Sequence, residues 1–362
     1  MLAFAVLVLL APVFYSYVST MLQPSSLPVG IRSIEWLRTH SGAWLVNGAE
    51  RLYYQWTAPK KGGPALRVLP SVGTGGSALT NGPAPISTLI HPALAGEGHW
   101  RSTGSPVAGA PPVLVTTFRS DPSYPRVVAY VAWIDHSRTQ LALYPGRYEP
   151  PHGSPRGPMS VPLGQRSRLL AAFNSGFTNK DGHGGFAVNG NVYAPLRPAQ
   201  ATLVAEQNGK VDVVSWTGGS APGPDIVLAR QNLPLIVEEG HRAPNLRDGS
   251  RWGATLGNAI RVWRSGVGID RHGNLLYAAA PYQTVGSLAD ILVHVGAVRA
   301  MELDINAEWP SFITYAGRGG QDPVKLVPNA QQSASRYLVP DDRDFFAVLA
   351  LRAHSSALVP FK

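Results

Sequence analysis

Polar and apolar residues alternate along the segment from residue 301 to residue 306. The apolar members are Met301, Leu303 and Ile305, and the polar members are Glu302, Asp304 and Asn306. Successive side chains of an extended strand point to opposite faces, so the pattern predicts a strand with one apolar and one acidic face. The apolar face suits a core, whereas the acidic face requires solvent, cations or a ligand. We therefore expect a functional site at this segment.

The residues before this segment predict a strand over 274–279 and a helix over 287–295. Ser287 and Asp290 form a candidate capping box for the helix, and Gly296 is its expected stop. A strand, a helix and a strand within about thirty residues form a βαβ unit, whose two strands are parallel. Asp304 and Asn306 would then lie at the carboxyl end of the second strand, where open α/β sheets tend to bind ligands.

Short apolar or alternating runs predict further strands along the chain. They cover residues 113–118, 127–134, 140–144, 168–173, 186–188, 192–194, 201–206, 210–216, 225–229, 261–263, 267–270 and 345–351. Asn189-Gly190 and Asn208-Gly209 predict tight hairpin turns with positive φ. The fold class expected for residues 113–353 is α+β, with a mixed, mostly antiparallel sheet and a C-terminal βαβ unit.

Residues 1–24 predict a transmembrane anchor or a signal segment. Residues 1–31 contain no Asp, Glu, Lys, Arg or His, and residues 1–22 are mostly apolar. As a helix, 22 residues reach about 33 Å, enough to cross a bilayer core. No basic residue precedes the apolar run and no clean cleavage site follows it, which favours an uncleaved anchor. We expect a membrane-anchored, extracytoplasmic protein, or a secreted one where the segment is cleaved.

Two segments separate this run from the predicted domain. Residues 25–57 read as an aromatic-rich helical segment, with a helix over 33–56 interrupted near Ser41-Gly42. Its tryptophans and tyrosines suit a membrane interface or packing onto the main domain. Residues 58–112 are rich in Pro, Gly, Ser and Ala, which predicts a linker or a surface wrap.

Composition narrows the classes of partner. The formal charge is +9, but charged residues make up only 15% of the chain and form no Lys/Arg block. We therefore expect no nucleic-acid partner, while anionic polymers such as phosphate-bearing glycans suit the surplus of positive charge. The chain contains no cysteine, which excludes disulfides, thiolate nucleophiles and cysteine metal sites.

Four segments resemble, in order, the motifs of the phosphodiester glycosidase domain family. They are residues 171–177 (AAFNSGF), 185–190 (GFAVNG), 264–270 (RSGVGID, with Gly273) and 288–304 (LADIL…GA…MELD). The resemblance covers residues 113–352. The family includes N-acetylglucosamine-1-phosphodiester alpha-N-acetylglucosaminidase and related bacterial exported proteins. Where the family typically has a glycine triplet followed by Ser-Thr, this chain has Ile305-Asn-Ala-Glu-Trp-Pro310.

The acidic segment and the resemblance together define the candidate site. Asp304 is the central residue, either supporting attack at an anomeric carbon as one of a carboxylate pair or holding a divalent cation. The candidate catalytic residues are Asp304, Glu302, Glu308 and His183. The candidate substrate-binding residues are Asn174, Arg264, Asn306, Gly176 and Gly268. The sequence demands no cofactor; calcium or magnesium held by Asp304 is the alternative.

The resemblance implies an exported, membrane-tethered hydrolase of sugar phosphodiester or related glycosidic linkages in cell-envelope polymers. In that interpretation Arg264 steadies the phosphate and Asn174 orients the substrate. Two alternatives stay open: a non-catalytic binding module for anionic envelope glycans, which the altered segment 305–310 favours, and a subunit of a membrane complex. The sequence shows no Gly-x-Ser-x-Gly elbow, so covalent serine catalysis is not indicated.

Overall fold

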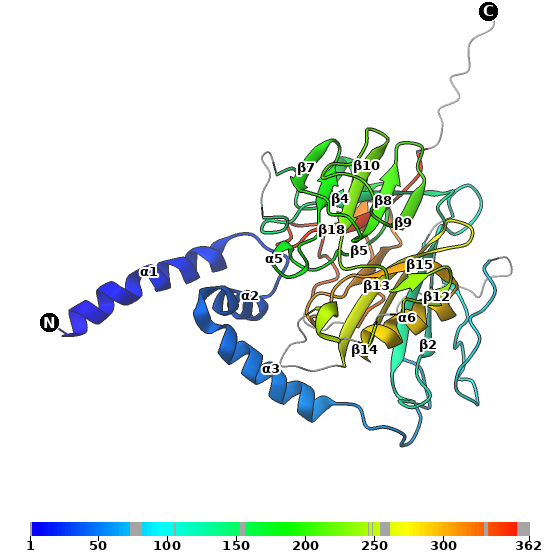
Figure 1. The fold of residues 1–362 in the computed structure, drawn as a ribbon, viewed down its shortest axis with the longest axis horizontal. Helices are drawn as coiled ribbons and strands as arrows, with labels where there is room; N and C mark the ends of the chain where they lie inside the picture. Colours follow the sequence, from blue (N-terminus) through cyan, green and yellow to red (C-terminus); the bar gives the residue numbers. More distant parts are fainter. Residues whose placement is uncertain are drawn as a thin grey trace, which may run out of the picture.

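The computed structural model describes residues 2–72, 82–104, 106–151, 156–244, 246–247, 249–253, 261–328 and 332–352. Its strands form three sheets packed against one another, with the three amino-terminal helices at one side (Figure 1). Every strand pairing among the described residues is antiparallel. The predicted α+β class with mostly antiparallel strands is confirmed.

The first sheet contains the predicted functional segment. Its order is β1 (Arg101–Ser102), β2 (Val113–Arg119), β3 (Val128–Ile134), β14 (Leu275–Gln283), β13 (Val262–Asp270), β15 (Ala297–Glu302), β11 (Val237–Glu238) and β12 (His241–Arg242). Leu276 and Ala278 pack with helix α6 (Val285–His294), whereas Tyr277 and Ala279 join the core shared with the other sheets. Both faces of β14 are covered, which explains why its sequence is apolar without alternation.

The predicted βαβ unit is present as β14, α6 and β15. Strand β13 lies between β14 and β15 and is antiparallel to both, so the outer two strands are parallel to each other without being paired. The helix begins earlier than predicted, because Thr284 is its N-cap and forms the capping box with Ser287. Gly296 ends it with a φ of +97°, a conformation that glycine adopts without steric cost.

The second and third sheets have five strands each. The second has the order β7 (Asn191–Ala194), β6 (Phe186–Val188), β10 (Ile226–Gln231), β8 (Ala201–Glu206) and β9 (Val211–Ser215). The third has the order β17 (Pro323–Lys325), β16 (Phe312–Tyr315), β5 (Leu169–Asn174), β18 (Phe345–Ala350) and β4 (Thr139–Tyr144). The short helices are α4 (Leu163–Arg166), α5 (Asn179–Gly182) and two 3-10 turns at Gly249–Trp252 and Arg318–Gly320.

Two local predictions are refined. Asn189 and Gly190 both have positive φ, at 49° and 78°, as the predicted hairpin turn requires, whereas at the second turn only Gly209 does, at 88°. The predicted strands over 261–263 and 267–270 form one strand, β13, whose register shifts between Val262 and Arg264. After this shift, Arg264 and Ser265 pair with Ala280 and Ala279 of β14, and the pairing continues to Ile269. The polar residues there therefore do not end the strand.

The amino-terminal residues form three helices, α1 (Leu2–Leu22), α2 (Val29–Leu37) and α3 (Ala43–Thr57). A π-helical turn at Arg38–Gly42, with Ser41 at a φ of +66°, separates α2 from α3. The predicted interruption near Ser41-Gly42 is therefore confirmed. No helix among the described residues is both long and apolar enough to cross a membrane, so the predicted transmembrane anchor is not supported.

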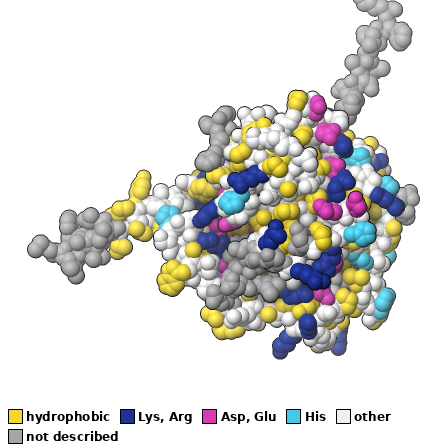
Figure 2. Space-filling view, in the orientation of Figure 1, with side chains coloured by type: hydrophobic (Ala, Val, Ile, Leu, Met, Phe, Trp, Pro, Cys, Tyr) yellow, Lys and Arg dark blue, Asp and Glu magenta, His cyan; other side chains and the backbone are white. Residues whose placement is uncertain are grey.

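Residues 82–104 lie against the first sheet. The guanidinium of Arg119 on β2 pairs with Glu97 at 2.7 Å, and both side chains are buried. Arg119 also donates to the carbonyl oxygens of Ile90 and Pro92, which fastens this irregular stretch to the strand. Lys and Arg side chains are spread over the face seen in Figure 2, with Asp and Glu among them.

Candidate active site

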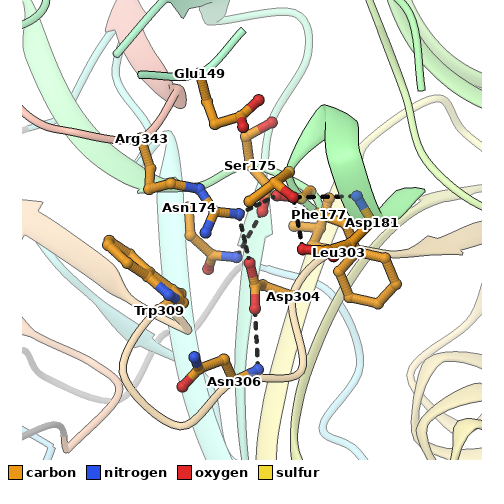
Figure 3. A network of polar contacts seen from close by, with 12 residues as sticks. Glu149, Asn174, Ser175, Phe177, Asp181, Leu303, Asp304, Asn306, Trp309 and Arg343 are labelled. Carbon is orange, nitrogen blue, oxygen red and sulfur yellow. Dashed lines mark hydrogen bonds and ion pairs between the residues drawn. The ribbon is translucent and has the colours of Figure 1, made fainter. Parts of the chain in front are cut away.

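The ends of three strands meet at one place (Figure 3). The segment Leu303–Asn306 follows β15, the segment Asn174–Phe177 contains the end of β5, and Arg343 lies two residues before β18. Because β15 already ends at Glu302, the segment 303–306 is a loop rather than the predicted continuation of the strand. The strand predicted from the alternation therefore ends four residues earlier than expected.

Asp304 is buried and held from several sides. Its Oδ2 atom accepts a hydrogen bond from Nη2 of Arg343 at 3.0 Å, and its Oδ1 atom accepts one from the Asn306 amide at 2.9 Å. Its own amide donates to Oγ of Ser265 on β13. Burial raises the pKa of the Asp304 carboxyl above its ordinary value, and Arg343 opposes that shift only in part.

Arg343 is the centre of the cluster. Besides Asp304, its Nη2 atom contacts the carbonyl oxygen of Gly176 at 3.1 Å, and its guanidinium lies 4.7 Å from the centre of the Trp309 ring. Burial disfavours the charged form, but the carboxylates of Asp304 and Glu149 outweigh it and raise the pKa of Arg343. Its buried Nε atom has no hydrogen-bond partner among the described residues.

Glu149 lies on the other side of Arg343 from Asp304 (Figure 3). The side chain is buried, and its Oε2 atom accepts a hydrogen bond from the Asn179 amide at 3.0 Å. Burial raises the pKa of the Glu149 carboxyl, and the charge of Arg343 opposes that shift. Two buried carboxyl groups with raised pKa values thus flank one guanidinium, an arrangement frequent at catalytic centres.

Asn174 fixes this arrangement from β5. Its Oδ1 atom accepts hydrogen bonds from the Tyr277 hydroxyl at 2.9 Å and the Ser311 amide at 3.0 Å. Its Nδ2 atom donates to the Ser175 carbonyl and to Oγ of Ser265. The side-chain amide of Asn174 thus connects β5 with the segments that carry Tyr277, Ser311 and Ser265. The neighbouring Ser175 hydroxyl, by contrast, is buried without a hydrogen-bond partner among the described residues.

Arg264 and Glu302 lie apart from this cluster. They form a fully buried ion pair with each other, and Arg264 also donates to the backbone carbonyls of Gln283 and Trp252. Burial raises the pKa of Glu302, and Arg264 opposes the shift. The predicted contact between Arg264 and a phosphate does not fit this placement, because its donors point into the protein interior.

Three further predicted residues, Gly176, Gly268 and His183, are placed differently from one another. Gly176 is in the cluster through its carbonyl oxygen. Gly268 is in the middle of β13, where a Cβ atom would lie 2.8 Å from the Arg299 carbonyl oxygen, so its glycine is explained by packing. His183 is exposed and caps the short helix α5 with a φ of +50°.

Asn306 and Glu308 line a pocket of about 760 Å³ beside the cluster. The loop is locally ordered, because the Glu308 amide donates to Oδ1 of Asn306 at 3.1 Å. Burial raises the pKa of Glu308 to about 7, and the negative charges of Glu35 and Glu50 add to the shift. Glu308 is connected to Asp304 through Asn306, so it lies outside the Asp304–Arg343–Glu149 cluster but next to it.

The amino-terminal segment covers this region of the domain. Tyr54 on α3 packs with Ile305 and Phe177, and Leu27 and Ile31 pack with Trp309. The hydroxyls of Ser25 and Ser26 donate to Asp342 and Asp341, at 3.0 and 2.7 Å. Ile305 and Trp309 stand where the resembling family has its glycine triplet, and here both provide apolar contacts for the cover.

A divalent cation at Asp304 does not fit the arrangement, because the guanidinium of Arg343 lies 3.0 Å from its carboxylate. Within the described part of the chain, no group of three or more His, Asp and Glu side chains could hold a metal ion. Arg343 and Glu149 were not predicted as site residues. The signal for Arg343 was the charged run Asp341-Asp-Arg-Asp344 directly before an apolar strand.

Three solved structures are among those similar to this chain. The catalytic domain of zebrafish N-acetylglucosamine-1-phosphodiester alpha-N-acetylglucosaminidase, auto-inhibited by its pro-peptide, has 15% identity and a TM-score of 0.45, covering 69% of this chain and 87% of its own. A hypothetical protein from Synechocystis has 14% identity and a TM-score of 0.40, covering 69% and 65%. A protein of Burkholderia pseudomallei described as exported has 15% identity and a TM-score of 0.39, covering 64% and 75%.

Similarity at the sequence level is confined to part of the chain. No curated protein is similar enough to count as a match. The sequence model of the phosphodiester glycosidase family matches residues 167–304, a range that begins just before β5 and ends at Asp304. All four motif segments lie within it, and the last of them ends at its final residue. The resemblance inferred from those motifs is thus confirmed: residues 167–304 match the phosphodiester glycosidase family.

Proposed function

We propose that this protein hydrolyses a sugar phosphodiester or a related glycosidic linkage. The observation that carries the proposal is the guanidinium of Arg343 between the carboxyl groups of Asp304 and Glu149, with its Nε donor unpartnered among the described residues. Arginine binds phosphate oxygens through paired N–H donors. Hydrolysis at an anomeric carbon uses two carboxyl groups, one on each side of the scissile bond.

The geometry supports a distinct role for each residue. Arg343 binds a phosphate oxygen of the substrate, taking the place that the sequence suggested for Arg264. Glu149, whose raised pKa keeps its proton to higher pH, donates that proton to the departing phosphate oxygen. Asp304 supports the positive charge that develops at the anomeric carbon. A water oxygen replaces the phosphate oxygen there, and the proton that this water loses returns to the Glu149 carboxylate. Asn174 acts as a positioning residue, because its amide holds the loops that carry the site.

For the substrate we propose a phosphate-bearing glycan of the cell envelope, met outside the cytoplasm. The formal charge of +9 favours an anionic polymer, and such glycans are found beyond the cytoplasmic membrane. Protease treatment of intact cells is the test of location, with a cytoplasmic enzyme as control. Digestion of this chain in intact cells is the expected outcome, and protection equal to that of the control would remove the proposal of an extracytoplasmic site.

A second candidate function is a non-catalytic module that binds anionic envelope glycans. It is favoured by the contacts of Asp304, whose two carboxylate oxygens already accept hydrogen bonds from Arg343 and the Asn306 amide. It is also favoured by the apolar residues Ile305 and Trp309, which lie under the amino-terminal helices. In that function Arg343 would bind the glycan without a reaction following.

The test is a hydrolysis assay on a panel of sugar-1-phosphodiesters, in which the release of free sugar is measured. We expect turnover by the wild type and a fall of at least about 100-fold in Asp304→Asn, since acid–base and charge-stabilising groups contribute at that level. The control is Asp225→Asn, an exposed aspartate in the turn just before β10, which should retain full activity. Absence of turnover together with glycan binding that Arg343→Met abolishes would favour the binding module instead.

A further inference from the structure

A separate pocket lies between the segment that follows α3 and the turn that connects β2 with β3. Its volume is about 430 Å³, which lies within the range of small-molecule sites. The amide of Gly62 donates to the Ser123 carbonyl oxygen at 2.9 Å, so the segment after α3 is fastened to this turn. The lining residues that matter here are Lys60, Tyr124, Arg126, Val127 and Tyr282.

The charged side chains that line this pocket are basic. Lys60 and Arg126 are both exposed, and neither forms a hydrogen bond or an ion pair with another described residue. No Asp or Glu is among the described residues of the wall. Asp121, in the same turn as Arg126, is paired with Arg261 at 3.5 Å. The pocket therefore has a surplus of positive charge, which favours an anionic ligand.

Two tyrosines add ring surfaces and hydroxyl groups to this charge. Tyr124 and Tyr282 both line the pocket. The guanidinium of Arg261 lies 4.1 Å from the centre of the Tyr124 ring and donates to the Tyr282 carbonyl oxygen at 3.0 Å, so one arginine holds both residues. A sugar has apolar C–H faces and polar hydroxyls, which suit an aromatic ring with a polar end. The chemistry of the pocket therefore matches an anionic sugar better than an anion alone.

The backbone at Tyr282 supports a use for its ring. Its φ is +55°, a value that is uncommon for a residue with a Cβ atom. Such conformations persist where the surroundings hold them, and they are frequent at ligand sites. Here the hydrogen bond from Arg261 and the pairing of Gln283 with Val262 hold the strand end in place. Glycine would adopt this backbone without steric cost, so the tyrosine is explained by its side chain.

This pocket and the candidate active site lie at the same end of the first sheet. Strands β3, β14, β13 and β15 are neighbours in that order, and each is antiparallel to the next. Val127 directly precedes β3 and Tyr282 is near the end of β14, while Asp304 follows the end of β15. Adjacent strands are about 4.8 Å apart, so about 14 Å separates β3 from β15. A polymer of a few sugar units can span this separation.

We propose that this pocket binds a phosphate-bearing sugar unit of a polymeric substrate, a few units away from the linkage that is cleaved. Lys60 and Arg126 bind the phosphate, while Tyr124 and Tyr282 contact the sugar. The proposal rests on the proposed function for the polymer being a substrate, and it adds that the polymer is held at two places. The binding itself can be tested without any turnover.

The first experiment measures binding of glucose 6-phosphate, inorganic phosphate and glucose to the full chain by calorimetry. We expect glucose 6-phosphate to bind at least about tenfold more tightly than either other probe, since hydrogen bonds to charged groups and contacts with a ring contribute at that level. The double variant Lys60→Gln/Arg126→Gln should lose at least about tenfold of this affinity. The matched control is Lys61→Gln, which removes the charge of an adjacent exposed residue outside the pocket wall and should bind as the wild type does.

Two further variants locate the contacts, and circular dichroism establishes that each variant is folded. Tyr282→Gly permits the left-handed backbone while removing the ring, so its affinity for glucose 6-phosphate should approach that for inorganic phosphate. Arg343→Met removes the arginine of the candidate active site and should retain the binding that the double variant loses. Equal affinity of the wild type for glucose 6-phosphate and inorganic phosphate would overturn the proposal. Binding that Arg343→Met abolishes and the double variant retains would place the ligand at the candidate active site and overturn it as well.

The second experiment compares hydrolysis of a single sugar-1-phosphodiester with that of an oligomer of several sugar phosphate units joined by the same linkage. In Lys60→Gln/Arg126→Gln we expect KM for the oligomer to rise at least about tenfold, with kcat unchanged. Both constants for the single diester should stay as in the wild type, because that substrate is too short to reach the pocket. An unchanged KM for the oligomer would show that the pocket does not hold the substrate.

The two experiments separate this proposal from the proposed function. Selective binding of glucose 6-phosphate with no hydrolysis of either substrate would overturn the hydrolase function and leave the pocket established, as the binding module requires. Hydrolysis of both substrates without selective binding would overturn the pocket proposal and leave the hydrolase function intact.

Discussion

The protein contains two arginine–carboxylate pairs that differ in what surrounds them. Arg264 and Glu302 connect β13 with β15, and their side chains are 1% and 0% exposed. Arg264 gives its other hydrogen bonds to backbone carbonyls at Gln283 and Trp252. This pair is enclosed by the sheet and by the side chains packed around it, so a substrate cannot reach it.

Arg343 and Asp304 form the second pair, at the strand ends, with side chains 12% and 6% exposed. Here the guanidinium keeps an unpartnered Nε among the described residues, contacts the face of Trp309 and has Glu149 on its other side. The difference teaches that the ion pair alone does not identify a site. The second pair differs from the first in its greater exposure, in its contact with Trp309 and in the second carboxyl group, of Glu149, beside its arginine.

The largest effect in this comparison is expected from breaking the enclosed pair. Arg264→Met leaves the Glu302 carboxylate buried without its counterion, which destabilises a protein by about 3–5 kcal/mol. Urea denaturation of the full chain measures this as a fall in the free energy of unfolding. The double variant Arg264→Met/Glu302→Leu should recover most of the loss, because no buried charge remains. A loss below about 1 kcal/mol in the single variant would show that water reaches this pair.

A smaller effect is expected from altering the pair at the strand ends. Arg343→Lys keeps the charge but replaces the planar fork with a single ammonium, which cannot bind a phosphate through paired donors. We expect kcat/KM for a sugar phosphodiester to fall about 10–100-fold, with little change in the midpoint of thermal unfolding. The matched control is Arg299→Lys, whose pair with Asp212 at 2.6 Å is part of the surface and should leave activity unchanged. Equal losses in both variants would contradict the assignment of Arg343.

The fold could be predicted in large part because its signals are local. The apolar run of β14, the Asn189-Gly190 turn and the Gly296 stop each depend on neighbouring residues alone, and each matches the structure. The end of β15 depends on residues far away in the sequence. The hydroxyl oxygen of Ser265 on β13 accepts a hydrogen bond from the Asp304 amide, and the Ser265 amide donates to the Asp304 carbonyl oxygen. Alternation of side chains gives no information about such partners.

The structure brings the predicted residues Asp304, Asn174 and Gly176 to one place, but the arginine beside them is Arg343 and not the predicted Arg264. Arg264 and Glu302 are 38 positions apart, and Arg343 and Asp304 are 39 apart. Sequence separation therefore cannot decide which arginine meets which carboxylate. The choice is made by the sheet, because β13 pairs with β15 and places Arg264 beside Glu302, while the loop before β18 brings Arg343 to the rim. Only the assembled strand order distinguishes them.

The smallest effect concerns the pocket beside the second pair, and it appears as a dependence of stability on pH. Burial raises the pKa of Glu308 from 4.5 to about 7, so between these values the folded state binds more protons than the unfolded state. The free energy of unfolding therefore falls as pH rises through this window and is constant above it. Partial hydration of the pocket reduces the full effect of the shift to about 1–2 kcal/mol.

Glu308→Gln removes this contribution, so the variant should lose less stability than the wild type between pH 5 and pH 8. The difference between the two proteins isolates Glu308, because the other carboxyl groups with raised pKa values, such as Glu50 and Glu149, are present in both. Urea denaturation at the two pH values measures it. Parallel stability curves would show that Glu308 ionises as readily in the folded protein as in the unfolded chain, and that the pocket is hydrated enough to hold its charge.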